Sequence, residues 1–172
     1  MFKWFKASVP ASIIIVFWGI LSWTVLPFQM STLESFDNEP LVAQTLTQNV
    51  SKAGVYILPA VDSEMKPGKP FIFASILPTG FDRSMGSMVF ASIIGNAIAA
   101  MLLCYILSKT TLHTYKEKVN FITVVGVFAA ICATFPAWNW WGFSSLYSLV
   151  LFLNIVVTWF LGGLVIAAIY HK

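Results

Sequence analysis

Residues 146–170 read LYSLVLFLNIVVTWFLGGLVIAAIY, a run of 25 residues without a charged side chain. Three further runs, 9–28, 87–108 and 119–135, are also apolar and uncharged. Because about 20 apolar residues suffice for a helix to cross ~30 Å of hydrocarbon, the sequence predicts four transmembrane helices. The third run is the shortest, about 25 Å at 1.5 Å per residue, and we expect Pro136 to end it.

The composition excludes a soluble globule. Hydrophobic residues make up 58% of the chain and charged residues 10%, with a mean hydropathy of +0.81. Such a chain needs the bilayer as its solvent. We predict an all-α membrane protein, a four-transmembrane-helix bundle with a small extracytoplasmic α+β insert. The parts are 1–28 with the first span, 29–86 as the insert, and 87–172 with spans two to four.

The distribution of charge predicts the orientation. The insert carries six acidic and four basic residues, and the connection after the third span carries no charge. Positive residues near span ends favour the cytoplasm, so we expect both termini to be cytoplasmic, in a bacterial inner (plasma) membrane. The basic residues outside the insert are Lys3, Lys6, Lys109, Lys116, Lys118 and Lys172.

The first span could instead be a cleaved signal peptide, because a basic segment precedes its apolar run. That run is longer than the usual 7–15 residues and is followed by Leu26-Pro27-Phe28-Gln29 rather than an Ala-x-Ala site. We therefore expect an uncleaved anchor.

Within the insert, Asp37 or Asn38 is expected to cap a helix at about 40–53, with Gly54 as its C-terminal cap. Strands are expected at about 55–59 and 71–77, joined by a turn over 62–70. The helix carries an apolar stripe that we expect to pack on a core, the alternatives being a partner or the membrane surface. The stripe is Leu41, Val42, Leu46 and Val50.

No disulfide is expected to stabilise the insert, since Cys104 and Cys132, the two cysteines, are both expected to be buried in spans. A lobe of this size is marginal by itself, so we expect support from the membrane domain, from another membrane protein or from a homo-oligomer.

The sequence offers no catalytic or metal-binding constellation. No ionisable residue lies inside a predicted span, and His113 and His171 lack a second ligand at metal-binding spacing. Four-span signal peptidases need two membrane-edge aspartates, whereas Asp82 stands alone there. We therefore expect that the protein is not an enzyme and binds no cofactor or metal.

Asn96 and Asn154 are the polar residues of most interest within the spans, because an amide in hydrocarbon needs a partner. Small residues at spacings of four residues predict close helix packing. These packing residues are Ala91, Gly95 and Ala99 in the second span, Gly126 and Ala130 in the third, and Gly163 and Ala167 in the fourth.

The segment Trp138-Asn139-Trp140-Trp141-Gly142-Phe143 is the most unusual local sequence. Tryptophans suit the membrane–water interface, so an anchoring belt is one interpretation. The other is an aromatic rim, shared with Trp18, Trp23 and Phe28 of the first span, that closes a groove for a lipid tail, quinone or partner helix.

We expect a non-enzymatic interaction or accessory subunit of a membrane assembly. One alternative is binding or transfer of a lipid, quinone or other hydrophobe in a groove formed by Asn96, Asn154, Trp138, Trp140 and Trp141. Another is a subunit of a transporter or channel. That function would require an oligomer, because four chargeless helices leave little room for a polar path.

Overall fold

The structure, a computed structural model, describes residues 2–60, 63–64 and 66–170. The start of the predicted turn at Asp62, and His171 and Lys172, lie outside the described residues. The long helices are α1 (Phe2–Thr24), α4 (Met85–Ser108), α5 (Tyr115–Trp141) and α6 (Ser145–Ile169). The shorter elements are α2 (Pro27–Met30), α3 (Glu39–Asn49), β1 (Gly54–Leu58) and β2 (Ile72–Ile76). Among these described residues, four helices are long and apolar enough to cross a membrane.

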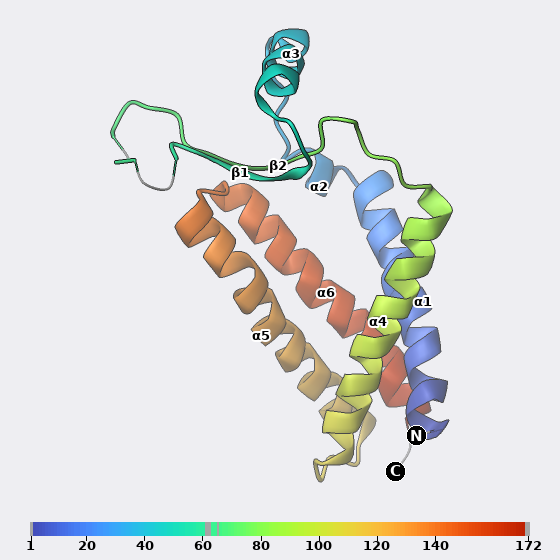
Figure 1. Ribbon diagram of the computed structural model, residues 1–172. Coiled ribbons are helices and arrows are strands. Elements are labelled where there is room, and N and C mark those ends of the chain that lie inside the picture. Colours follow the sequence, from blue (N-terminus) through green and yellow to red (C-terminus); the bar gives the residue numbers. More distant parts are fainter. Residues whose placement is uncertain (1, 61–62, 65, 171–172) are drawn as a thin grey trace.

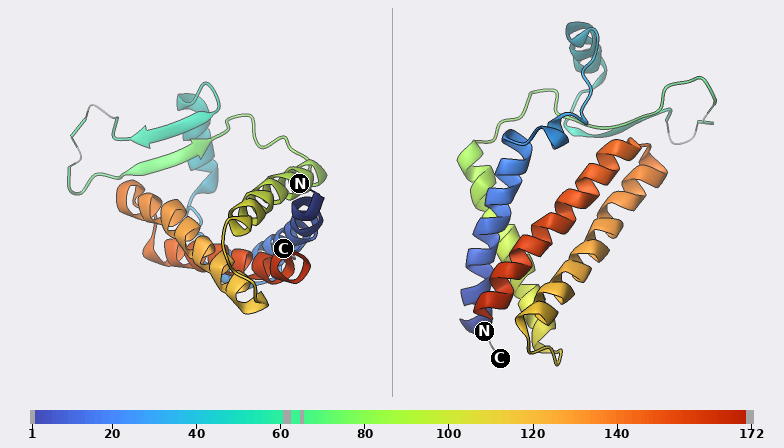
Figure 2. Two further views of the ribbon diagram at one scale, coloured as in Figure 1. Left: turned by 90° about the horizontal axis from the view of Figure 1, so that it is seen from below. Right: turned by 180° about the vertical axis from the view of Figure 1, so that it is seen from behind.

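The long helices pack in the order α4, α1, α6 and α5, so α1 and α6 are the inner pair. They converge at the end that carries the chain termini and diverge toward the end that carries the insert (Figure 1; Figure 2, right). We call these the terminal end and the insert end. The β-hairpin lies across the insert end, and α3 projects beyond it (Figure 1).

The predicted end of the third span is wrong. Helix α5 continues through Pro136 to Trp141 and ends where Gly142 adopts a left-handed conformation, with φ +69°. A proline removes one backbone donor but does not always stop a helix in a membrane. At 27 residues, α5 is about 40 Å long and needs no thinning of the bilayer. The tryptophans therefore lie on a helix and not in a connecting loop.

The first helix is also longer at its start than predicted. It runs from Phe2 with Pro10 inside it and ends at Thr24, and 27–30 forms the separate helix α2. Pro27 lies in the first turn of α2, where the missing donor costs no hydrogen bond.

The insert helix is shorter than predicted. Asn38 caps α3 by accepting a hydrogen bond from the Leu41 backbone N–H at 3.1 Å. The helix ends at Asn49 because Val50 is extended, and Gly54 is the first residue of β1 rather than a helix cap. The two strands pair antiparallel, with Gly54 opposite Ile76 and Leu58 opposite Ile72.

The core lies at the terminal end, where all four long helices contribute to it. Its buried residues are Ala7, Ala11, Ala100, Leu103, Cys104, Leu107, Ile122, Ile166 and Tyr170. Lys118, one of the basic residues that we used to predict the orientation, is 4% exposed, and its Nζ donates to the Tyr170 carbonyl at 3.1 Å. This bond satisfies a carbonyl at the end of α6 and ties that end to the first turn of α5.

Glycines set the closest helix approaches. A Cβ added to Gly126 would lie 2.6 Å from the Trp159 Cβ, and one added to Gly163 would lie 3.2 Å from the Ile122 Cγ2. Gly162, which the sequence analysis did not single out, approaches Ile15 of α1, with 2.8 Å from an added Cβ to Cδ1. Helix α6 therefore meets both α1 and α5 at glycines, where an added Cβ would require the neighbouring side chain to shift.

The predicted small-residue face of α4 lies mostly on the exposed side of the helix. Ala91 and Gly95 are exposed, Ala99 is half-buried, and an added Cβ at Gly95 would meet nothing within 4 Å. Because the helices diverge toward the insert end, α4 is buried mainly in its second half, from Ala100 onward. The stripe from Ala91 to Ala99 is therefore not a close helix contact within this chain.

These observations predict that Gly126→Ala destabilises the protein by about 1–3 kcal/mol, because the new methyl group meets the Cβ of Trp159 and the backbone must shift. Gly95→Ala is the matched control and should be neutral or slightly stabilising, since alanine favours helix more than glycine does. Denaturant unfolding of the detergent-solubilised variants measures both. Equal stability of the two variants would contradict the close contact.

Candidate functional site

The structure does not bring the predicted groove residues together. Asn96 lines a groove between α1 and α4, and Trp138 lines a separate groove between α5 and α6. Trp141 lies beneath the hairpin, and Trp140 is 72% exposed. Asn154 binds Trp18 at the contact between α6 and α1. No single site contains all five.

The Asn154 amide has an interhelical partner. Its Oδ1 accepts a hydrogen bond from Trp18 Nε1 at 2.9 Å, across 136 residues of sequence. Both groups would otherwise lose a hydrogen bond on entering hydrocarbon. Trp18 therefore joins α1 to α6 at this contact rather than forming part of an aromatic rim with Trp138.

Asn96 lies in a groove of about 480 Å³ that is formed mainly by the insert-end halves of α1 and α4. Its Nδ2 donates to the Ser92 carbonyl of its own helix at 2.8 Å. The groove also includes Trp23 and Thr158, so α6 contributes to it. One N–H of the amide is thus bonded within its own helix.

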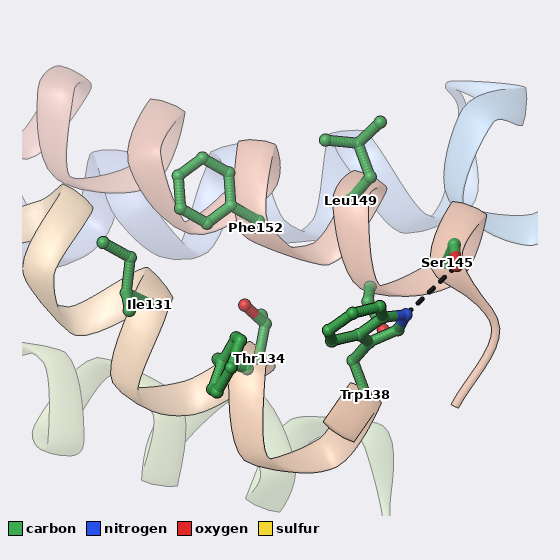
Figure 3. Close-up of a pocket in the computed structure, with 8 residues that line it drawn as sticks. Ile131, Thr134, Trp138, Ser145, Leu149 and Phe152 are labelled. Carbon is green, nitrogen blue, oxygen red and sulfur yellow. Dashed lines mark hydrogen bonds between the residues drawn. The ribbon is translucent and has the colours of Figure 1, made fainter. Parts of the chain in front are cut away.

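A second groove, of about 410 Å³, separates α5 from α6 at the insert end. Trp138 Nε1 donates to Ser145 Oγ at 3.1 Å and closes one end of it, as Figure 3 shows. Thr134 donates to the Ala130 carbonyl at 2.8 Å. Ser148, only 9% exposed, has a hydroxyl without a hydrogen-bond partner among the described residues.

The hairpin contacts the bundle through aromatic rings. Phe73 of β2 stacks on Trp141, with ring centroids 4.3 Å apart and planes 16° from parallel. Phe71 lies over Gly142, 3.6 Å from the position of an added Cβ. Such a stacked pair contributes about 0.5–1.5 kcal/mol beyond its buried area. Trp141 therefore anchors the insert as well as belonging to the end of α5.

Helix α3 has no buried residue, so the predicted packing of its apolar stripe on a core is wrong for the single chain. Leu41 is 57% and Leu46 is 37% exposed, and only Val50, just past the helix end, is buried. On the hairpin, the paired residues Leu58 and Ile72 are each 46% exposed. We call Leu41, Leu46, Leu58 and Ile72 the insert face.

Gln29 of α2 is a buried polar residue that the sequence did not single out. It is 2% exposed, and neither amide atom has a hydrogen-bond partner among the described residues. Trp23 and Tyr147 lie beside it, in a space without room for a water molecule. The one signal in the sequence was the position of Gln29 just after an apolar span. That position is also compatible with a side chain that faces the lipid headgroups.

The residues that the structure describes contain no group of three His, Cys, Asp or Glu side chains that could hold a metal. Both cysteines are free, and Cys132 is exposed on the outer surface of the bundle, contrary to the prediction that both are buried. Only Cys104 belongs to the core.

The surface of the long helices is that of a membrane protein. Phe17, Phe90 and Phe128 are 61–67% exposed, on helices that carry almost no charge. Exposed apolar surface on this scale requires lipid or another protein around it. Comparisons with protein-family models, curated proteins and solved structures find no match to this chain. The fold thus defines its class, a protein with four helices able to span a membrane.

The bond between Trp18 and Asn154 generates a prediction. In a double-mutant cycle, Trp18→Phe and Asn154→Leu should show a coupling of about 0.6 kcal/mol, up to about 1.7. The control cycle pairs Trp18→Phe with Asn96→Leu, whose amide donates within its own helix, and should be additive. Unfolding free energies in detergent give both coupling values. An additive result for Trp18 and Asn154 would contradict the interhelical hydrogen bond.

Proposed function

We propose that this protein is a non-enzymatic subunit of a membrane assembly and that the insert face binds another protein chain. The observation that carries the proposal is α3, an 11-residue helix without a buried side chain. Isolated helices shorter than about 12–15 residues are marginal in water, even with favourable sequences. A partner that covers Leu41 and Leu46 would supply the missing stabilisation.

The hairpin offers further exposed apolar residues. Phe73 faces Trp141, and side chains alternate along a strand, so Leu58 and its partner Ile72 face away from the bundle. An isolated two-stranded hairpin is at best marginally stable, and this one is supported from one side only. A protein laid against its open side would bury apolar residues of the hairpin and of α3 together.

The proposed orientation places the insert outside the cytoplasm of a bacterial cell and both termini inside it. Lys109 and Lys116 support this orientation, since both flank the connection at the terminal end. The partner on the outer side is then a second copy of this chain or another membrane protein with an exposed domain there.

Site-directed crosslinking tests the insert face. Leu46→Cys and Thr47→Cys place a benzophenone reagent on neighbouring residues of α3, of which only Leu46 belongs to the apolar stripe. In intact membranes, Leu46→Cys should yield one reproducible adduct, several-fold more than Thr47→Cys. Mass spectrometry of the adduct identifies the second chain as a copy or as a different protein.

The chain without either substitution controls for reaction at Cys104 and Cys132. Equal yields from the two positions, or a changing mixture of adducts, would show that α3 has no preferred partner and would contradict the proposal.

A further inference from the structure

The Ser148 hydroxyl in the groove between α5 and α6 is unsatisfied by this chain. It is 9% exposed and has no hydrogen-bond partner among the described residues. A serine in a helix often returns its hydroxyl to a carbonyl three or four residues earlier, as Ser12 does to Val9 at 2.8 Å. Leaving a buried hydroxyl unpaired is unfavourable, so a group that enters the groove and accepts from Ser148 gains a bond that the free protein lacks.

The groove is polar at one end and apolar at the other. Trp138 and Ser145 lie at the insert end, with Ile131 and Phe152 about two turns farther into the bundle (Figure 3). The seven residues from Ile131 to Trp138 correspond to about 10 Å along the helix axis. Because Trp138 and its neighbours have the character of a membrane interface, the apolar end points into the hydrocarbon region.

We propose that this groove binds one acyl chain and the adjoining glycerol ester of a membrane phospholipid, with the Ser148 hydroxyl donating to the ester carbonyl. Glycerol esters lie where polar headgroups meet hydrocarbon, and their acyl chains continue inward, in the same order as the groove lining. This site is independent of the insert face and does not involve Asn96 or Asn154.

The size of the groove favours an acyl chain over a partner helix. A cylinder about 10 Å across and one helical turn long already occupies roughly 420 Å³. The groove holds about 410 Å³ and extends along about two turns of α5. An extended hydrocarbon chain is narrow enough to follow its whole length between Thr134 and Leu149.

The test measures phospholipid retained by the full-length protein. The protein is reconstituted in dioleoylphosphatidylglycerol vesicles, extracted, and washed with detergent, and the bound phospholipid is quantified per chain across a range of lipid concentrations. Wild type should retain one phospholipid. Ser148→Ala should weaken retention roughly threefold to tenfold, the effect of one hydrogen bond. Leu149→Trp should abolish retention by filling the groove.

Leu153→Trp is the matched control, since Leu153 is 51% exposed, lies one turn from Leu149 and does not line the groove. It should retain lipid as wild type does. Equal retention by all four proteins, or loss in Leu153→Trp as well, would overturn the proposal. If Ser148→Ala fails to fold, the comparison of Leu149→Trp with Leu153→Trp still tests whether the groove binds the lipid.

Discussion

The close approach of α6 to its two neighbours is the contact on which the rest of the structure depends. Gly162 admits Ile15 of α1, while Gly163 and Gly126 let α6 and α5 approach each other through Ile122 and Trp159. Apolar burial gives helices little reason to associate in lipid, so close van der Waals packing must hold them together. Glycine allows this packing because no Cβ separates the two helices.

These contacts lie between the terminal end and the middle of the long helices and so determine where the bundle opens. The core and the bond from Lys118 to Tyr170 are at that end as well. At the insert end the pair α1 and α4 diverges from the pair α5 and α6 (Figure 1). A groove lies within each pair, and the hairpin contacts the bundle through Trp141 and its neighbours. A closely packed terminal end and an open insert end are thus two results of the same packing. Interaction surfaces are expected at the open end.

Length and hydropathy were enough to predict four long apolar helices, because both are properties of single segments. The end of α5 was mispredicted because a proline can lie within a helix and Gly142, with its left-handed conformation, sets the true end. Pairings between distant residues could not be read from one sequence. Asn154 was expected to need a partner, but nothing in its neighbourhood pointed to Trp18. For the same reason the five predicted groove residues, chosen by type, proved to lie in different places.

The central claim is that this chain is completed by another protein at its insert end. Native mass spectrometry of the untagged protein, extracted from its own membrane in mild detergent, tests it most directly. The account predicts a complex of defined stoichiometry that is heavier than one 19.1 kDa chain and that survives dilution. A single chain, alone or with lipid only, in every mild detergent would contradict it.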